Sequence, residues 1–105
     1  MLELSLEGRI TIENVIRKMC HAPADLFRIQ KRGYIREGYY ADLVLVNPGI
    51  SIKVSSENIL YKCGWSPLEG VSFSHTVTHT FVNGHLAWSQ NGINPDVRGM
   101  RLMFD

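Results

Sequence analysis

The segment TVTHTFVNGHLAW, Thr76–Trp88, decides how the second half of this 105-residue chain folds. Two segments of alternating apolar and polar residues are joined by Asn83-Gly84, a pair that tolerates positive φ at both central positions of a type I′ turn. The pattern therefore predicts a β-hairpin. Its expected cross-strand pairs are Val82 with His85, Phe81 with Leu86, and His79 with Trp88.

Two further strands are expected upstream of the hairpin. The β-branched apolar run Ala41–Val46 is closed by Asn47-Pro48-Gly49 and is typical of a strand buried on both faces. Ile50–Val54 alternates apolar and polar residues, which predicts a half-buried strand. Ser55–Leu60 predicts a turn followed by a single turn of helix.

The first third of the chain has the spacing of a helix. One apolar stripe is formed by Ile12, Val15, Ile16, Met19 and Cys20. Thr11 supplies an N-cap hydroxyl, and the helix is expected to end at His21-Ala22-Pro23, because proline disfavours helical geometry in the preceding residue. A short second helix is expected at Ala24–Phe27. Helices followed by strands indicate an α+β fold.

Composition excludes several classes of partner. The 11 basic and 10 acidic residues leave a net charge of +1 with no basic stripe, so a nucleic acid is not expected to bind. No apolar run approaches the ~20 residues of a membrane span, and Met1–Leu4 does not open like a signal peptide, so a cytoplasmic location and no membrane contact are expected. Cys20 and Cys63 are expected to be buried free thiols.

The residues that could carry chemistry do not form a recognisable motif. His75 and His79 lie four apart on a predicted strand, which separates their Cα atoms by ~13 Å, too far for one tetrahedral ion. Ser72 and Ser74 lie close to His75 but outside any nucleophile motif. No phosphate-binding glycine loop is present. The sequence therefore predicts no catalytic, cofactor-binding or metal-binding residue in this chain.

The loop Trp65–Gly70 is the most unusual in the chain. It combines an aromatic residue, a rigid turn former, an apolar residue and a carboxylate in six positions. Two interpretations stay open: the loop flanks a ligand cleft, or it caps one end of a sheet, which is the favoured interpretation.

Several segments resemble members of the amidohydrolase superfamily, in the expected order. Gly33–Val46 resembles the superfamily's G-x-I-x-x-G-x-x-A-D-L-V-L segment. Pro23-Ala24 is similar to part of the preceding N-P-A-x-x-F element, with Ala22 in place of asparagine. Thr78–His85 resembles the closing T-x-V-x-G hairpin.

Two other segments resemble one branch of that superfamily. Trp65–Gly70 is similar to the S-P-F-E-G loop of dihydroorotases, allantoinases and hydantoinases, with Leu68 in place of phenylalanine. Gly99–Asp105 most resembles the end of a dihydroorotase. The resemblance implies that residues 1–32 are terminal helices of a (β/α)8 barrel and residues 33–105 the C-terminal half of a composite β-sandwich.

The resemblance also implies a zinc-dependent parent enzyme that interconverts N-carbamoyl-L-aspartate and L-dihydroorotate in pyrimidine biosynthesis. The family's zinc ligands are an H-x-H pair, an often carboxylated lysine, two further histidines and an aspartate, and none of these motifs occurs here. The isolated chain is therefore expected to be inactive and metal-free. Its expected partners are the missing N-terminal part of the same enzyme and, for the fragment alone, further copies of itself.

Two alternatives remain. The first is a fragment of a hydantoinase, allantoinase or dihydropyrimidinase, which shares the same loop and hairpin. The second is a free-standing β-rich interaction module, for which Trp65 and Trp88 would serve as anchors.

Overall fold

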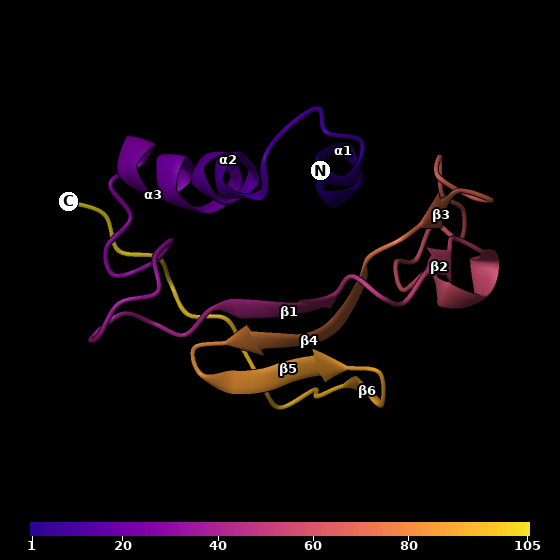
Figure 1. Cartoon of the computed structure of the whole chain (residues 1–105). Coiled ribbons are helices and arrows are strands. Elements are labelled where there is room, and N and C mark those ends of the chain that lie inside the picture. The colour runs from indigo at the N-terminus through magenta and orange to yellow at the C-terminus, as the bar shows by residue number, and fades with distance from the viewer.

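Helical elements occupy the start of the chain in the computed structural model, which describes all residues, 1–105. They are α1 (Leu2–Leu6), α2 (Ile12–Ile16), the π-helical turn η1 (Arg17–His21) and α3 (Ala22–Leu26). The last three form one rod (Figure 1). As predicted, Thr11 is the N-cap, and its side chain accepts a hydrogen bond of 3.3 Å from the backbone N–H of Asn14. None of the helices is long and apolar enough to cross a membrane.

The predicted helix end at His21-Ala22-Pro23 is wrong. The backbone stays helical through this segment, and the N–H of Ala22 donates to the carbonyl of Arg17, five residues back. This wider π turn shifts the hydrogen-bond register just before Pro23, so the helix accommodates a residue that has no N–H to donate. The rod ends at Leu26 instead.

The strands form two antiparallel sheets. The larger has the order β1-β4-β5-β6, and the smaller pairs β2 with β3. Their bounds are β1 Leu43–Asn47, β2 Ile52–Lys53, β3 Ser72–Phe73, β4 Thr76–Val82, β5 His85–Ser89 and β6 Gly92–Ile93. A 3₁₀ turn, η2 (Ser56–Asn58), follows β2 within the segment Ser55–Leu60, where a turn and a single helical turn were expected. The chain is therefore a mixed helix and sheet structure, as expected.

The predicted hairpin is confirmed in its turn and in part of its register. Asn83 and Gly84 have φ values of 52° and 84°, as a type I′ turn requires. Val82 lies opposite His85 and Phe81 opposite Leu86. The predicted pairing of His79 with Trp88 is wrong: a bulge between Thr80 and Phe81 places Trp88 opposite Thr80 and His79 opposite Ser89.

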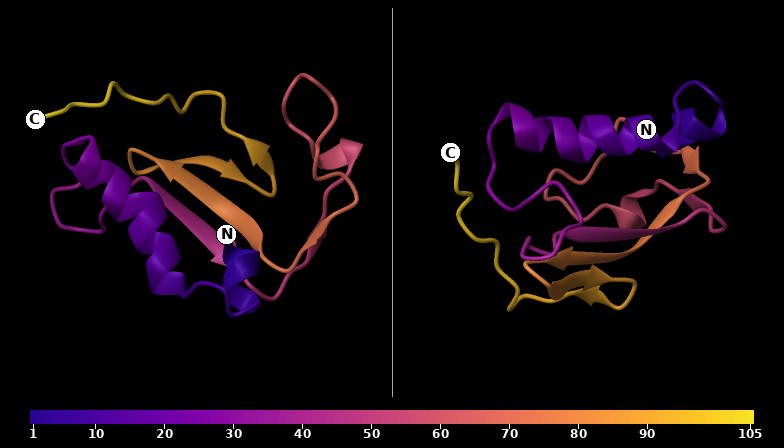
Figure 2. Two further views of the ribbon diagram at one scale, coloured as in Figure 1. Left: turned by 90° about the horizontal axis from the view of Figure 1, so that it is seen from above. Right: turned by 60° about the vertical axis from the view of Figure 1, so that its left-hand side comes forward.

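Very little of the molecule is buried. The buried residues are Val15, Ala24 and Thr76, which are 5%, 5% and 8% exposed. The radius of gyration is 15.4 Å, against about 13 Å for a compact domain of this length. The helices form a layer beside the four-stranded sheet (Figure 2), and few residues of the helices lie close to residues of the strands.

This sparse packing overturns two burial predictions. Val44 and Leu45 of β1 are 56% and 49% exposed, so the strand is not buried on both faces, because the helices pack only sparsely against the strands. Cys20 and Cys63 are free but exposed, Cys20 on an uncovered helix face and Cys63 in a loop. These residues are apolar, but no layer of the structure packs closely enough against them to bury them.

The C-terminal tail returns to the end of the helical rod (Figure 2). Ile29 and Phe104 form an isolated antiparallel bridge. The N–H of Gln30 donates to the carbonyl of Met103 at 2.9 Å, and the N–H of Asp105 donates to that of Arg28 at 3.1 Å. The tail thus links the helical layer to the far edge of the sheet.

Candidate functional site

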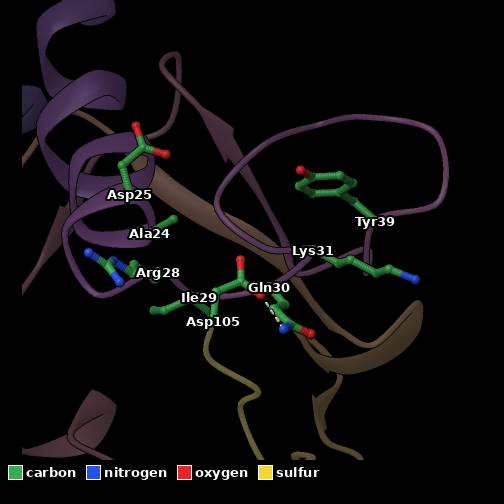
Figure 3. Close-up of a pocket in the computed structure, with 8 residues that line it drawn as sticks. All are labelled: Ala24, Asp25, Arg28, Ile29, Gln30, Lys31, Tyr39 and Asp105. Atoms are coloured by element: carbon green, nitrogen blue, oxygen red, sulfur yellow. Dashed lines mark hydrogen bonds between the residues drawn. The ribbon is translucent and has the colours of Figure 1, made fainter.

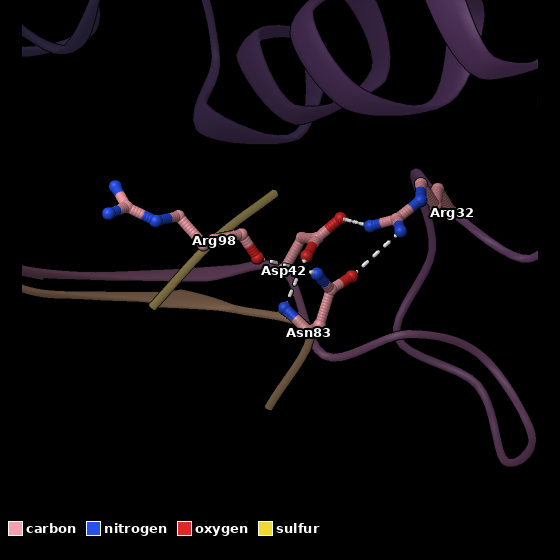
Figure 4. A network of polar contacts seen from close by, with 4 residues as sticks. All are labelled: Arg32, Asp42, Asn83 and Arg98. Carbon is pink, nitrogen blue, oxygen red and sulfur yellow. Dashed lines mark hydrogen bonds and ion pairs between the residues drawn. The ribbon is translucent and has the colours of Figure 1, made fainter. Parts of the chain in front are cut away.

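The most extensive polar network joins the segment after the helices to the hairpin turn (Figure 4). Arg32 forms an ion pair with Asp42 and donates a hydrogen bond of 2.7 Å to Asn83 Oδ1. Asp42 Oδ1 in turn accepts from the backbone N–H of Asn83 at 2.8 Å. The Arg32 side chain is only 11% exposed. We name the trio Arg32, Asp42 and Asn83 the hairpin clamp.

Local geometry explains why these residues meet. The carbonyl of Ala41 accepts from the N–H of Gly84 at 3.0 Å, which brings the start of β1 against the type I′ turn. Asn83 also donates from Nδ2 to the carbonyl of Arg98 in the C-terminal segment, at 3.4 Å. Hydrogen bonds between charged groups are about twice as strong as neutral ones. The clamp therefore ties three segments together, and its polar atoms are engaged in holding the fold.

A second contact fastens the loop after the helices to the helix end. The Tyr34 hydroxyl donates to Asp25 at 2.6 Å, and the His21 ring stacks on Tyr34 with centroids 4.2 Å apart. The bond to the Asp25 carboxylate, aided by reduced contact with water, raises the pKa of Tyr34 above its ordinary value. Gly33 makes this approach possible, because a Cβ there would lie 2.4 Å from the Cβ of Ala24.

Glu3 forms a third contact, between α1 and the segment preceding β4. Its Oε1 accepts from the backbone N–H of Ser74 at 2.7 Å and lies 3.1 Å from Nδ1 of His75. The hydrogen bond with His75 is the main cause that lowers the pKa of Glu3; burial opposes it and the bond from Ser74 supports it. Sequence reasoning missed Glu3, because a contact across more than 70 residues leaves no local signal.

The four histidines do not gather. His21 stacks on Tyr34, His75 binds Glu3, His79 Nδ1 lies 3.1 Å from Thr78 Oγ1, and His85 follows the hairpin turn. No group of three or more His, Cys, Asp or Glu side chains in residues 1–105 could hold a metal ion. The residues present therefore do not fit a zinc centre of the kind that the resemblance implies for a parent enzyme.

The loop Trp65–Gly70 closes the end of the two-stranded sheet. The N–H of Gly70 donates to the carbonyl of Val54 at 2.9 Å, and Ser66 Oγ accepts from the N–H of Leu68 at 3.1 Å. Trp65 is exposed. This arrangement agrees with the sheet-capping interpretation of the loop.

A hollow of about 640 Å³ lies where the tail meets the helix end (Figure 3). It is lined by Ala24, Asp25, Arg28, Ile29, Gln30, Lys31, Tyr39 and Asp105. Its charges have both signs, and its two carboxylates already accept hydrogen bonds from Tyr34 and Gln30. The lining holds the tail in place and offers no set of convergent free groups for a ligand.

Comparison with known proteins gives this arrangement a context. The model of the Amidohydrolase family matches residues 1–87, which include the whole hairpin clamp. The chain is 31% identical over 103 residues to a dihydroorotase from Pyrococcus horikoshii, a match that covers 98% of this chain and 24% of the relative. It is 32% identical over 88 residues to a dihydroorotase from Carboxydothermus hydrogenoformans, covering 84% and 20%.

A dihydroorotase from a Wolbachia species is 34% identical over 94 residues, covering 86% of this chain and 21% of the relative. The chain therefore spans about a quarter or less of the length of these relatives. The matches run through the segments that carry the resemblance, including the Gly33–Val46 segment. The chain belongs to the amidohydrolase family.

Proposed function

We propose that this chain is the C-terminal structural region of a dihydroorotase-like, zinc-dependent amidohydrolase. The parent enzyme would interconvert N-carbamoyl-L-aspartate and L-dihydroorotate in pyrimidine biosynthesis. One observation carries the proposal: nearly the whole chain, 98%, matches a dihydroorotase of which it spans only 24%. The segment motifs occur along the chain in the family's order, which supports the same assignment.

Exposed apolar surfaces support a proposed assignment of the chain to two parts of the parent enzyme. Residues 1–32 would be the last helices of the parent barrel, and residues 33–105 part of a composite β-sandwich. The helical rod exposes Ile12, Ile16 and Met19 on its apolar stripe, and β1 exposes Val44 and Leu45. Apolar surface of this extent, on two layers that barely pack together, is typical of a region that packs against further protein.

Zinc chemistry belongs to residues outside this chain in this proposal. The chain offers no metal-binding cluster, and its histidines are engaged in separate contacts. The chain's own contribution would be to hold the helix end, through the hairpin clamp, at a fixed position relative to the sheet. The isolated chain would then be inactive.

The alternatives are less well supported. A hydantoinase, allantoinase or dihydropyrimidinase parent shares the Trp65–Gly70 loop, but the relatives described above are dihydroorotases. A free-standing interaction module would need exposed aromatic anchors. Trp65 is 61% exposed, whereas Trp88 is half-buried within the hairpin, so only one anchor is available.

The proposal is tested by sequencing the gene upstream of Met1 and by assaying an extended protein beside the isolated chain. The reading frame is extended upstream of Met1, and the extended protein and the isolated chain are each assayed with zinc on dihydroorotate and on hydantoin. We expect an upstream H-x-H pair, activity of the extended protein on dihydroorotate, and none for the isolated chain. A frame that begins at Met1, activity of the isolated chain, or a preference for hydantoin would contradict the proposal.

A further inference from the structure

The chain contains two Asn-Gly pairs, Asn83-Gly84 and Asn91-Gly92. Asparagine before glycine is chemically labile, because glycine has no side chain to hinder attack of its backbone nitrogen on the asparagine amide. The asparagine side chain must be free to turn towards that nitrogen, so hydrogen bonds that hold it slow the reaction. The structure places the two pairs in different surroundings.

Both side-chain polar atoms of Asn83 are hydrogen-bonded (Figure 4). Its Oδ1 accepts from Arg32 at 2.7 Å, and its Nδ2 donates to the carbonyl of Arg98 at 3.4 Å. The backbone N–H of Gly84, whose nitrogen would attack, donates to the carbonyl of Ala41 at 3.0 Å. Attack at Asn83 therefore requires the hairpin clamp to break.

Asn91 lies in the turn between β5 and β6, where its side chain makes no hydrogen bond. Asn91 and Gly92 are both exposed. Gly92 belongs to β6, an edge strand whose pairing with β5 consists of Gly92 with Ser89 and Ile93 with Trp88 (Figure 1). A strand end with so few pairs opens locally at little cost in free energy. Neither the Asn91 side chain nor the Gly92 nitrogen is therefore firmly held.

We propose that Asn91 is a site of spontaneous deamidation, at which its side-chain amide becomes a carboxylate. The backbone nitrogen of Gly92 forms a bond with Cγ of Asn91, and the Cγ–Nδ2 bond breaks. The proton of the Gly92 N–H passes through water to the leaving nitrogen, which departs as ammonia. A water molecule then opens the cyclic imide at either carbonyl, which gives aspartate or isoaspartate.

The conversion changes both the charge and the backbone of the turn. Either product adds a negative charge between β5 and β6, and isoaspartate also adds a carbon atom to the main chain. A longer main chain does not fit the short turn that sets Ser89 opposite Gly92. Isoaspartate should therefore unpair β6. The proposal concerns this chain itself and does not rest on the proposed function.

The two Asn-Gly pairs are each other's control within one molecule. The 105-residue chain is incubated at mildly alkaline pH, and the conversion of each asparagine is followed by peptide mapping with mass spectrometry. In the folded chain, Asn91 should convert roughly tenfold faster than Asn83 or more, because Asn83 must first lose its hydrogen bonds. In urea the two should convert at similar rates, because glycine follows both.

Asn91→Gln provides a second measurement, since the longer glutamine side chain cyclises far less readily. Asn91 makes no side-chain hydrogen bond, so the variant should fold as the wild-type chain does. The acidic species that accumulates in the folded wild-type chain, followed by ion-exchange chromatography, should be lost in this variant. Equal conversion of Asn83 and Asn91 in the folded chain, or a difference that persists in urea, would overturn the proposal. So would an acidic species that forms equally fast in Asn91→Gln.

Discussion

The contacts inside the helical layer and inside the four-stranded sheet differ from the contacts that join these two layers. Each is regular inside, through backbone hydrogen bonds, and each has a largely bare apolar face. Polar contacts join them: Glu3 with Ser74 and His75, the hairpin clamp, and the bridge from the tail to Ile29. Burial of apolar surface, worth about 25 cal/mol per Å², contributes little between the layers.

The position of the two layers therefore depends on a few specific contacts instead of a shared core. Substitutions at these contacts, and at the contact that fastens the loop after the helices to the helix end, should therefore destabilise the chain much more than similar substitutions elsewhere. Gly33 and Arg32 are each compared below with a matched residue that lacks the contact, and Glu3 is compared with its own uncharged variant.

The largest effect is expected at Gly33, and Gly38 provides the control. Both have φ near +80°, so alanine strains the backbone at either position. Only at Gly33 would the new Cβ clash, with Ala24 and with the carbonyl of Cys20 at 2.8 Å. Gly33→Ala should lower the free energy of unfolding by about 3 kcal/mol, and Gly38→Ala by about 1 kcal/mol. Urea denaturation followed by circular dichroism measures both, and equal losses would refute the close approach at Gly33.

The hairpin clamp should give the next effect. Arg32→Ala removes an ion pair and a hydrogen bond from a side chain that is 11% exposed, and should cost about 2 kcal/mol of unfolding free energy. Arg9→Ala is the control, because its ion pair with Glu7 is exposed and should cost less than about 0.5 kcal/mol. Thermal unfolding compares the two variants. Similar shifts in Tm would mean that the clamp does not join the layers.

The smallest effect is a dependence on pH that comes from Glu3. Because its pKa is lowered in the folded chain, the folded state holds the Glu3 proton less tightly than the unfolded state. The contact with Ser74 and His75 should therefore be fully present above the ordinary glutamate pKa of about 4.3 and be lost as pH falls through the lower folded value. Denaturation curves recorded from neutral pH downward should show this loss in the wild-type chain. Glu3→Gln should lose less stability than the wild-type chain as the pH falls. If both chains lose the same stability, the loss comes from other carboxylates.

Local signals predicted local structure well. Asn83-Gly84 predicted the hairpin turn, and Thr11 predicted the helix start, because each acts through its own backbone conformation or through hydrogen bonds to residues a few positions away. The order of helix and strand was also predictable, since hydrophobic periodicity reports it directly. The bulge at Thr80 and the π turn before Pro23 were missed, because both arise from small adjustments within an element that periodicity does not encode.

Contacts across long sequence separations were not predictable. The sequence showed Asp42 and Asn83 in their motifs but not that Arg32 would join them, and it gave no sign of the Glu3 contact. Burial was overestimated for Val44, Leu45 and both cysteines. Apolar residues indicate that a surface is suited to be covered; they do not indicate that the covering layer lies in the same chain.

We propose above that this chain supplies structure and no metal ligands to an amidohydrolase. The most direct measurement is the zinc content of the purified chain after equilibrium dialysis against zinc, by elemental analysis. We expect well below one zinc per chain, with no change in His75→Ala or His79→Ala. One zinc per chain, lost on either substitution, would contradict it.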